Sequence, residues 1–286
     1  MKVRIVVDST TDLPPEIKSR LTVVPLTILF GDQAYVDGIT ITHQQFYEKL
    51  VESDVLPTTS QASPAVFEKV FQKAKAAGES VVVLTLSAKL SGTWQSAMIA
   101  AREFDNVHVV DSHSVAIGTG ILAQLALEMA ERGMSAADIA RELERERNNV
   151  CIVAMLDTLE YLKRGGRISK TVAFAGSLLS IKPVVSLHNG EIEILGKARG
   201  SRQGNNLLVE KIQAAGGVDF DKPLLLGYTG MSDVLLQKYI RDSAFLWADH
   251  LVDLPQTIIG SVVGTHAGPG AVAVAFFKGS AKEAAQ

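Results

Sequence analysis

The chain has little cysteine and no long uninterrupted hydrophobic run: its 286 residues include one cysteine, Cys151. A single cysteine cannot form an internal disulfide, which fits a reducing cytoplasm. The apolar start at residues 1–7 is too short for a signal peptide, and Asp8 follows it directly. The apolar stretch 172–179 is likewise too short to cross a membrane. We therefore expect a soluble, cytoplasmic protein whose membrane contact is at most transient.

The chain also lacks an excess of positive charge and the common cofactor motifs. Its 28 Lys and Arg residues against 31 Asp and Glu residues give a net charge of −3, which argues against a nucleic-acid partner. The sequence contains no P-loop, no Gly-x-Ser-x-Gly nucleophile elbow and no His, Cys and carboxylate spacing typical of zinc. We expect neither a metal nor a cofactor.

What is present is an ordinary globular composition, with 47% hydrophobic and 21% charged residues, over a length that suits one large or two ordinary domains. Up to residue 150, short apolar runs alternate with helical patterns. The predicted strands are Val3–Val7, Thr22–Phe30, Ser80–Leu86 and Val107–Val110. This alternation predicts an α/β domain over residues 1–150, whose mainly parallel sheet has helices on both faces.

The pattern changes in residues 151–286, which we predict to form a second α/β domain. The runs Pro183–Leu187 and Glu191–Gly196 flank His188-Asn189-Gly190, a strong β-hairpin signal. The other predicted elements are helices at Asp157–Lys163, Asn205–Ala215 and Ser232–Ala248 and strands at Leu224–Thr229, Ile258–Val263 and Ala271–Phe277.

Two hydroxyl-rich runs are the most informative feature of the sequence. Thr58-Thr59-Ser60-Gln61-Ala62-Ser63-Pro64 and Leu90-Ser91-Gly92-Thr93 each stand just ahead of a helical pattern. A helix start offers unpaired backbone N–H groups and the positive end of the helix dipole, so two such starts would bind a small anion such as a carboxylate. Apart from Lys89 at the edge of the second run, no Lys or Arg is present, which favours recognition by hydrogen bonds. Each hydroxyl taken alone also fits an ordinary helix cap.

Other candidate residues have a structural interpretation beside the functional one. Gly118-Thr119-Gly120 formally matches a dinucleotide fingerprint but begins too far from its strand, so we interpret it as small residues that allow close helix packing. Asp8 is either a nucleophile or a structural residue at a strand end. His266 lies in a Gly-rich segment between two predicted strands, where it either contacts a ligand or is satisfied locally. The basic cluster that includes Arg199 and Arg202 is typical of a solvated face.

Taken together, these motifs resemble the DegV family. The resemblance rests on Asp8-Ser9-Thr10-Thr11-Asp12-Leu13, Pro57-Thr58-Thr59-Ser60-Gln61, Leu90-Ser91-Gly92-Thr93, Asp111-Ser112, Gly165-Gly166-Arg167-Ile168, and His266 with Gly268-Pro269-Gly270. The characterised bacterial members of the family are fatty-acid-binding proteins, the FakB subunits of fatty acid kinase. The resemblance implies a two-domain α/β protein that holds one long-chain fatty acid in a closed tunnel between its domains.

The resemblance also implies a role and a set of site residues. The bound carboxyl group would be presented to a separate ATP-dependent fatty acid kinase, and the acyl-phosphate would be released for phospholipid synthesis. Thr59 and Ser91 match the residues that hydrogen-bond the carboxyl group, and His266 matches a polar member of the same network. The further candidates are the neighbours Thr58, Ser60, Gly92 and Thr93, and a kinase-docking surface with Arg167, Arg199 and Arg202.

Two other functions stay open from the residues themselves. One is a stand-alone hydrolase or phosphotransferase with Asp8 or Ser91 as nucleophile, although no His and Asp relay can be placed beside Ser91. The other is a lipid-sensing regulatory module that acts without a kinase. The carrier is the preferred hypothesis, and it makes the chain a lipid-binding subunit rather than an enzyme. The side chains that either line the tunnel or belong to the core include Phe30, Phe174, Leu178 and Ile181.

Overall fold

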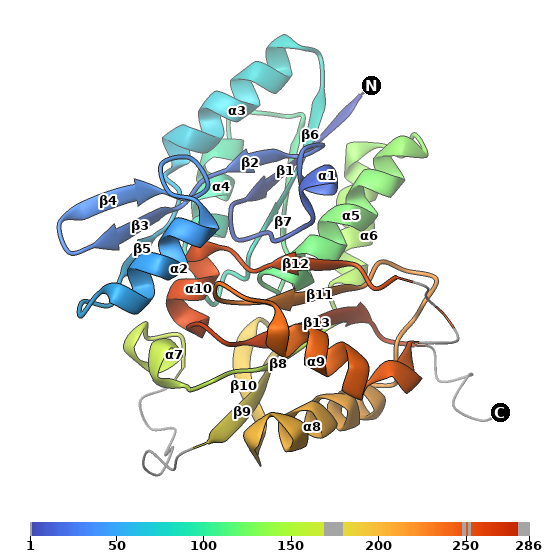
Figure 1. The fold of residues 1–286 in the computed structure, drawn as a ribbon. Coiled ribbons are helices and arrows are strands. Elements are labelled where there is room, and N and C mark those ends of the chain that lie inside the picture. The colour runs from blue at the N-terminus through green and yellow to red at the C-terminus, as the bar shows by residue number, and fades with distance from the viewer. Residues whose placement is uncertain (1, 169–179, 248–249, 251–252, 280–286) are drawn as a thin grey trace.

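The computed structural model describes residues 2–168, 180–247, 250 and 253–279, which form two lobes around three β-sheets (Figure 1). The predicted positions Phe174 and Leu178 lie outside the described residues. The first sheet has four parallel strands in the order β2-β1-β6-β7. Its strands are β1 (Val3–Asp8), β2 (Thr22–Val24), β6 (Ser80–Thr85) and β7 (Val107–Asp111).

Helices cover both faces of this sheet, as predicted from its unbroken apolar strands. Alternate side chains of β6 point to opposite faces, so Val82 and Leu84 pack into one core cluster and Val81 and Val83 into another. The first cluster includes α5 (Ile117–Glu131) and α6 (Ala136–Glu146), and the second includes α3 (Pro64–Ala76) and α4 (Thr93–Ala101). The expected parallel sheet with helices on both faces is thereby confirmed.

A small antiparallel sheet in the order β4-β3-β5 extends this lobe. Its members are β3 (Thr27–Phe30), β4 (Gln33–Val36) and β5 (Thr58–Ser60), and the helices beside the two sheets are α1 (Pro15–Lys18) and α2 (His43–Glu52). The prediction of one strand over Thr22–Phe30 is wrong, because the strand breaks at Pro25. Proline has no N–H for a β-ladder, and the next N–H, that of Leu26, donates instead to Ser9 Oγ at 3.1 Å.

The other lobe contains a six-stranded mixed sheet in the order β10-β9-β8-β13-β11-β12. The strands are β8 (Val150–Met155), β9 (Ile181–His188), β10 (Glu191–Arg199), β11 (Leu225–Tyr228), β12 (Gln256–Ile258) and β13 (Val272–Phe277). The predicted hairpin is confirmed as β9 and β10, which pair from Ile181–Arg199 to His188–Glu191. Its turn residues Asn189 and Gly190 have φ values of +49° and +81°, as a two-residue hairpin turn of type I′ requires.

Helices pack on both faces of the six-stranded sheet as well. One face carries α8 (Gly200–Ala214) and α9 (Val234–Asp242). The shorter helical segments of this lobe are α7 (Glu160–Arg164), α10 (Ser261–Ala267) and a 3₁₀ turn at Ala244–Leu246. The other face packs on α5, which therefore lies between the two large sheets (Figure 1). The predicted helix over Ser232–Ala248 is shorter than expected, because it ends at Asp242 and is followed by the 3₁₀ turn.

The glycines of α5 allow this helix to approach its neighbours closely. A Cβ atom on Gly118 would lie 2.1 Å from Ser114 Oγ, and one on Gly120 would lie 2.3 Å from the backbone oxygen of Asp12. Neither distance is possible for a real side chain. The interpretation of Gly118-Thr119-Gly120 as a packing motif, rather than a dinucleotide fingerprint, is thereby supported.

The segment around His266 differs from its predicted structure. We expected a strand over Ile258–Val263, but β12 ends at Ile258 and α10 begins at Ser261. The β-branched run favours a strand locally. Packing overrides that preference, since Val262 is buried against the core of the first lobe while Ile258 stays in the sheet of the second. His266 consequently lies on a helix between the lobes.

Candidate functional site

A cavity of about 440 Å³ lies where the two lobes meet. This volume falls within the range of roughly 300–1,000 Å³ that is usual for small-molecule sites. The first lobe contributes residues of β5, the β6–α4 loop and the segment just before α5, and the second contributes residues of β8, β9, α7 and α10. Most of the wall is apolar, and its larger side chains are Leu26, Leu86, Leu90, Ile152, Leu156, Leu162, Leu187, Ile192 and Ile259.

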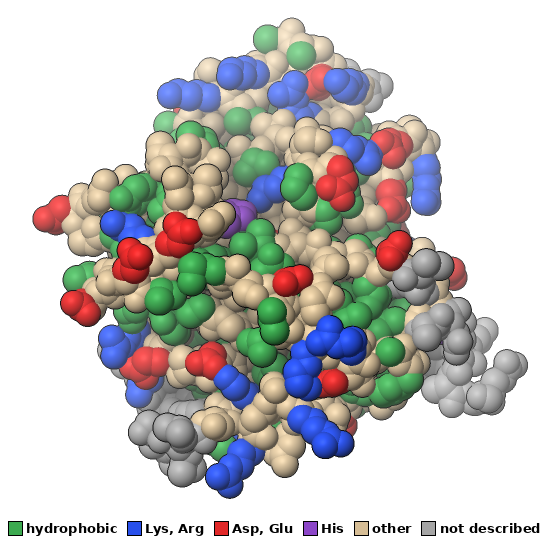
Figure 2. Space-filling model, in the orientation of Figure 1, with side chains coloured by type: hydrophobic (Ala, Val, Ile, Leu, Met, Phe, Trp, Pro, Cys, Tyr) green, Lys and Arg blue, Asp and Glu red, His purple; other side chains and the backbone are tan. Residues whose placement is uncertain are grey.

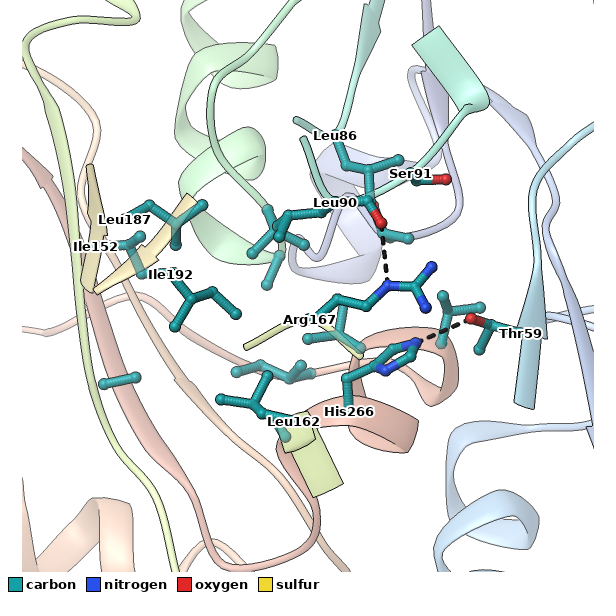
Figure 3. A pocket seen from close by; sticks show the side chains of 18 of the residues that line it. Thr59, Leu86, Leu90, Ser91, Ile152, Leu162, Arg167, Leu187, Ile192 and His266 are labelled. Carbon is teal, nitrogen blue, oxygen red and sulfur yellow. Dashed lines mark hydrogen bonds between the residues drawn. The ribbon is translucent and has the colours of Figure 1, made fainter. Parts of the chain in front are cut away.

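Four polar side chains lie together at one end of the cavity, as Figure 3 shows. They are Thr59, Ser91, His266 and Arg167, whereas Ile152 and Leu187 are at the opposite end. These four polar residues come from four separate parts of the chain. The cavity therefore has the polarity of an amphipathic ligand with a small polar head and an apolar body.

Thr59 and His266 form a direct contact between the lobes, because Thr59 Oγ1 lies 2.9 Å from His266 Nε2. Burial, followed by the charge of Arg167, lowers the pKa of His266 to about 4. The imidazole is therefore neutral near pH 7 and carries one donor and one acceptor nitrogen. Its other nitrogen, Nδ1, packs so closely on Gly165 that a Cβ atom there would lie 2.2 Å away. This packing explains why position 165 requires glycine.

Ser91 lies in the loop that leads into α4. Its Oγ lies 2.9 Å from Thr93 Oγ1 and accepts a hydrogen bond from the Thr93 N–H at 3.3 Å. The hydroxyl is thus oriented by the first residue of the helix, and Ser91 lines the cavity. The prediction that this run stands at a helix start is correct.

The run that contains Thr59 is not a helix start. Thr58–Ser60 forms strand β5, in which Thr59 pairs with Ile28 of β3, and α3 begins at Pro64. Ser63 precedes this helix without a side-chain capping bond. The expectation of two helix starts facing one anion is therefore wrong for this half of the site, because strand pairing with β3 takes up the backbone groups.

Of the neighbouring candidates, Ser60 and Gly92 line the cavity, whereas Thr58 and Thr93 do not. The side chain of Thr93 is fully buried and bonded to Ser91, and Thr58 is exposed on the strand. Successive side chains of strand β5 point to opposite faces, which explains why Thr59 lines the cavity and Thr58 does not. Alternation does not explain Ser60, the last residue of the strand, which also lines the cavity.

Gln61 joins the two hydroxyl-rich runs, which we did not anticipate. Its Nε2 donates to Ser96 Oγ of α4 at 2.9 Å, and its Oε1 would lie 2.0 Å from a Cβ atom on Gly92. The side chain thereby fixes the strand with Thr59 against the helix after Ser91. The motif contains Gln61, but nothing in the sequence indicates its partner.

Arg167 brings a positive charge to the polar end, contrary to the expectation of recognition without full charges. Its Nε donates to the Leu90 oxygen at 3.1 Å and its Nη1 to the Gly165 oxygen at 2.7 Å. Within the described ranges, no Asp or Glu forms an ion pair with this half-buried guanidinium. Figure 3 shows it between Ser91 and His266, where it lines the cavity. Its part in a docking surface with Arg199 and Arg202 stays a prediction.

The carboxylate of Asp8 has a structural role. It is fully buried and accepts hydrogen bonds from the Thr10 N–H at 3.0 Å, the Thr10 hydroxyl at 2.6 Å and the Leu86 N–H at 2.8 Å. Burial raises the pKa of Asp8 despite these bonds. The carboxylate thus joins β1 to the loop after β6, and it does not line the cavity.

Metal-binding clusters and membrane-spanning helices are both absent from the described residues. No group of three or more His, Cys, Asp and Glu side chains there has an arrangement that could hold a metal ion. No helix in the same part of the chain is long and apolar enough to span a membrane.

The fold and the site define a two-lobed α/β protein with an apolar cavity between its lobes and a polar cluster at one end. The chain belongs to the DegV family, since the family model described as "Uncharacterised protein, DegV family" matches residues 2–279. A DegV domain-containing protein of Deinococcus radiodurans is 36% identical over 283 residues, which cover 96% of this chain and 98% of that protein.

Solved structures of fatty-acid-binding DegV proteins have the same fold. The fatty-acid-binding DegV family protein of Thermus thermophilus matches with a TM-score of 0.86 and 35% identity, over 97% of this chain and 100% of the other. A stearic-acid-binding protein of Eubacterium ventriosum matches with a TM-score of 0.84 and 26% identity, over 96% and 98% of the two chains.

Proposed function

We propose that this protein is a carrier for one long-chain fatty acid and presents the carboxyl group of that acid to a separate fatty acid kinase. The observation that carries the first part is the cavity, which is apolar along most of its wall and has Thr59, Ser91, His266 and Arg167 at one end. The similar Thermus and Eubacterium proteins are described as fatty-acid-binding and stearic-acid-binding. Their folds and this cavity together favour a fatty acid over other amphipathic ligands.

Burial of the acyl chain supplies enough free energy for tight binding. A sixteen-carbon acid has about fourteen methylene groups, and at about 0.8 kcal/mol each their burial contributes at most about 11 kcal/mol. Ordering of the chain and loss of its overall motion reduce this value. The polar cluster therefore needs to orient the carboxyl group rather than provide most of the affinity.

The polar end can orient a carboxylate without a fixed ion pair. The hydroxyl groups of Thr59 and Ser91 can donate to carboxylate oxygens. When Thr59 does so, its Oγ1 accepts from Nε2 of neutral His266, which then carries the ring proton. The guanidinium of Arg167 is held by backbone carbonyls and adds positive potential beside them. The carboxylate is thereby attracted and aligned while an oxygen stays accessible for phosphoryl transfer.

The test of carriage is denaturing mass spectrometry of the purified protein, combined with binding of added palmitate or oleate. We expect a co-purified fatty acid of long chain or saturable binding with 1:1 stoichiometry. Absence of lipid together with no binding of either acid would contradict the proposal.

The test of the carboxyl site compares hydroxyl-deletion variants. Thr59→Ala and Ser91→Ala should reduce acyl-phosphate formation with a purified fatty acid kinase and ATP more than they reduce palmitate binding, because they misplace the head and leave the tail buried. Thr58→Ala is the matched control, since Thr58 is exposed on the same strand outside the cavity. Equal turnover by the parent, Thr59→Ala and Ser91→Ala would reject this role.

The kinase-docking part of the proposal involves Arg167, Arg199 and Arg202, and it is best tested at Arg199 and Arg202, which do not line the cavity. Both are exposed, at the end of β10 and in α8, and Figure 2 shows Lys and Arg side chains gathered over the α8 and α9 region. Arg199→Glu and Arg202→Glu should weaken kinase capture without changing palmitate affinity, whereas Arg141→Glu on exposed α6 should change neither. A pull-down that recovers no kinase with the parent protein would favour the lipid-sensing alternative.

A stand-alone enzyme is the less favoured function. Asp8 is enclosed by Thr10 and Leu86, and the nearest bonded partner of Ser91 is Thr93 rather than a histidine. Acyl-ester or phosphoester turnover by the isolated chain would revive this alternative.

A further inference from the structure

A second hollow lies between the two lobes and shares no lining residue with the cavity described above. Its volume is about 640 Å³, which is also within the usual range of roughly 300–1,000 Å³ for small-molecule sites. The first lobe contributes the loop after β1, α1 and the first residue of α2. The second lobe contributes β12, the end of β11 and the residue before α9 (Figure 1). We call this space the α1–β12 hollow.

Asp12 is the buried acid of the α1–β12 hollow. The residue is 1% exposed, and its Oδ1 accepts a hydrogen bond from the Gly260 N–H of the other lobe at 3.0 Å. Its other oxygen, Oδ2, is buried and has no hydrogen-bond partner among the described residues. A buried carboxylate oxygen without a partner has lost its hydration and gained nothing in return, so such atoms are rare in folded proteins. The orphaned oxygen therefore points to a ligand that donates to it.

A second buried carboxyl group acts on Asp12. Asp37 is 3% exposed, and neither of its carboxylate oxygens has a hydrogen-bond partner in the described part of the chain. Burial raises the pKa of Asp12 to about 7, and the negative charges of Asp37 and Asp8 act in the same direction. The positive charge of Lys18 and the hydrogen bond from Gly260 oppose this rise. A further cation beside Asp12 would favour its charged form, so the cluster has the electrostatics of a cation site.

The contacts of Asp12 select the kind of cation. Because Oδ1 is already bonded to Gly260, a single oxygen is left, whereas a guanidinium binds best to two oxygens of one carboxylate. An ammonium group needs only one oxygen from each acceptor. Leu13 and Ile258 give the hollow apolar walls that suit a short alkyl chain, and Asp233 adds a second carboxylate to its lining.

Lys18 also lines the α1–β12 hollow and is the competing cation of this chain. It is half-buried, and within the described ranges no ion pair joins it to an Asp or Glu side chain. Its charge lowers the pKa of Asp12 without occupying Oδ2. This oxygen is therefore available to a donor from outside the chain.

We propose that the α1–β12 hollow binds a small alkylammonium ion, the protonated form of a primary amine. Its ammonium group donates to Asp12 Oδ2, and its alkyl chain lies against Leu13 and Ile258. This site is separate from the fatty-acid cavity and does not depend on the proposed function. Since the amine needs the ionised carboxylate, a proton and the amine compete for Asp12.

The titratable and charged groups around Asp12 come from both lobes and are Asp8, Lys18, Asp37, His43, Tyr47, Tyr228 and Asp233. Burial raises the pKa of both tyrosines, so they stay neutral between pH 6 and pH 8. Burial and the charge of Lys18 lower the pKa of His43 against the effect of Asp37. A protonated His43 would repel an amine as well, so its contribution has to be separated from that of Asp12.

The experiment follows the Gly260 amide in ¹⁵N NMR spectra of the full chain, because this N–H donates to Asp12. The probe is n-butylammonium chloride, and the matched control is tetramethylammonium chloride, which has the same charge but no N–H donor. We expect a saturable shift with butylammonium alone. Its affinity should be about tenfold higher at pH 8 than at pH 6, as competition with a proton at a pKa of about 7 implies.

Three variants locate the site. Asp12→Asn keeps an acceptor for the Gly260 N–H and removes the charge, so the saturable shift should disappear while circular dichroism stays that of the parent. His43→Gln should bind butylammonium and keep the rise in affinity between pH 6 and pH 8. Asp105→Asn removes an exposed carboxylate outside the hollow and should behave as the parent does.

Two results would overturn the inference without Asp12→Asn, should this variant fail to fold. One is an equal response of the parent to butylammonium and tetramethylammonium. The other is binding of butylammonium by Lys18→Met but not by the parent, which would show that Lys18 itself serves Asp12 in solution. Undiminished binding by a folded Asp12→Asn would also overturn it. Palmitate binding by the same samples reports on the cavity alone, so the carrier proposal stands or fails separately.

Discussion

His266 is neutral in the folded chain at the pH where an exposed histidine would begin to gain a proton. Its pKa is lowered from 6.5 to about 4, first by burial and then by the positive charge of Arg167. Between these two values the unfolded chain binds more protons at this position than the folded chain does. Acid therefore favours the unfolded state, and the stability contributed by neutral His266 is lost as the pH falls.

This difference predicts the pH dependence of stability. In urea unfolding of the ligand-free protein, the free energy of unfolding should fall from pH 6.5 to pH 4.5 more steeply for the parent than for His266→Asn. Asparagine keeps a polar group beside Thr59 but does not titrate, so the other ionisable groups cancel in the comparison. Identical slopes for the two proteins would show that His266 is not buried in its neutral form.

At the scale of elements, the relative position of β5 and α4 depends on the side chain of Gln61, which occupies the space beside Gly92. Gly92 has φ of −74°, which any residue can adopt, so its requirement for glycine comes from contact and not from the backbone. The contact is with Gln61, whose amide also bonds to Ser96. The positions of the two hydroxyl-rich runs relative to each other are therefore fixed by side-chain packing between the two elements.

A double-mutant cycle tests this arrangement. Gly92→Ala should destabilise the protein by about 1–3 kcal/mol, since the new methyl group displaces Gln61. Gln61→Ala alone should cost about 1 kcal/mol for the lost hydrogen bond to Ser96. In the double variant the clash is absent, so its loss of stability in urea unfolding should be smaller than the sum of the single losses. An additive result would mean that the two residues do not interact.

At the scale of the whole molecule, the two lobes share a hydrophobic core. The cluster around α5 includes Ile5 and Leu84 of the parallel sheet together with Ile152, Leu225 and Phe277 of the mixed sheet. Each of the two sheets buries one of its faces against α5, so neither face stays buried if this helix is lost. The lobes should therefore unfold in one transition, although each has its own sheet and its own second cluster on the far side.

The two tryptophans of the chain allow this to be measured, because Trp94 lies in the first lobe and Trp247 in the second. Trp94→Phe and Trp247→Phe leave one fluorescent reporter each, and we expect the same denaturation midpoint within either variant by fluorescence and by circular dichroism. Ile121→Ala in the shared core should lower the stability reported by both tryptophans, by about 2–5 kcal/mol. Separate fluorescence and circular dichroism midpoints would indicate that the lobes unfold independently.

Much of the fold could be predicted from the sequence because the deciding signals are local. The unbroken apolar run of β6 specified a strand buried on both faces, and Asn189-Gly190 specified the hairpin turn through its positive φ values. The hydroxyl-rich run before α4 was located correctly for the same reason. Propensity, periodicity and turn chemistry act between residues that are near each other in the chain, so a single sequence determines them.

The tertiary structure alone decided the rest, because those features depend on residues far apart in the chain. The packing of Val262 against the first lobe makes a helix from a segment whose β-branched residues favour a strand, and this helix carries His266. Arg167 is held at the polar end by the hydrogen bond that its guanidinium donates to the Leu90 oxygen in the other lobe. Local sequence preferences set which elements can form, whereas burial of their apolar faces against one another determined which side chains meet.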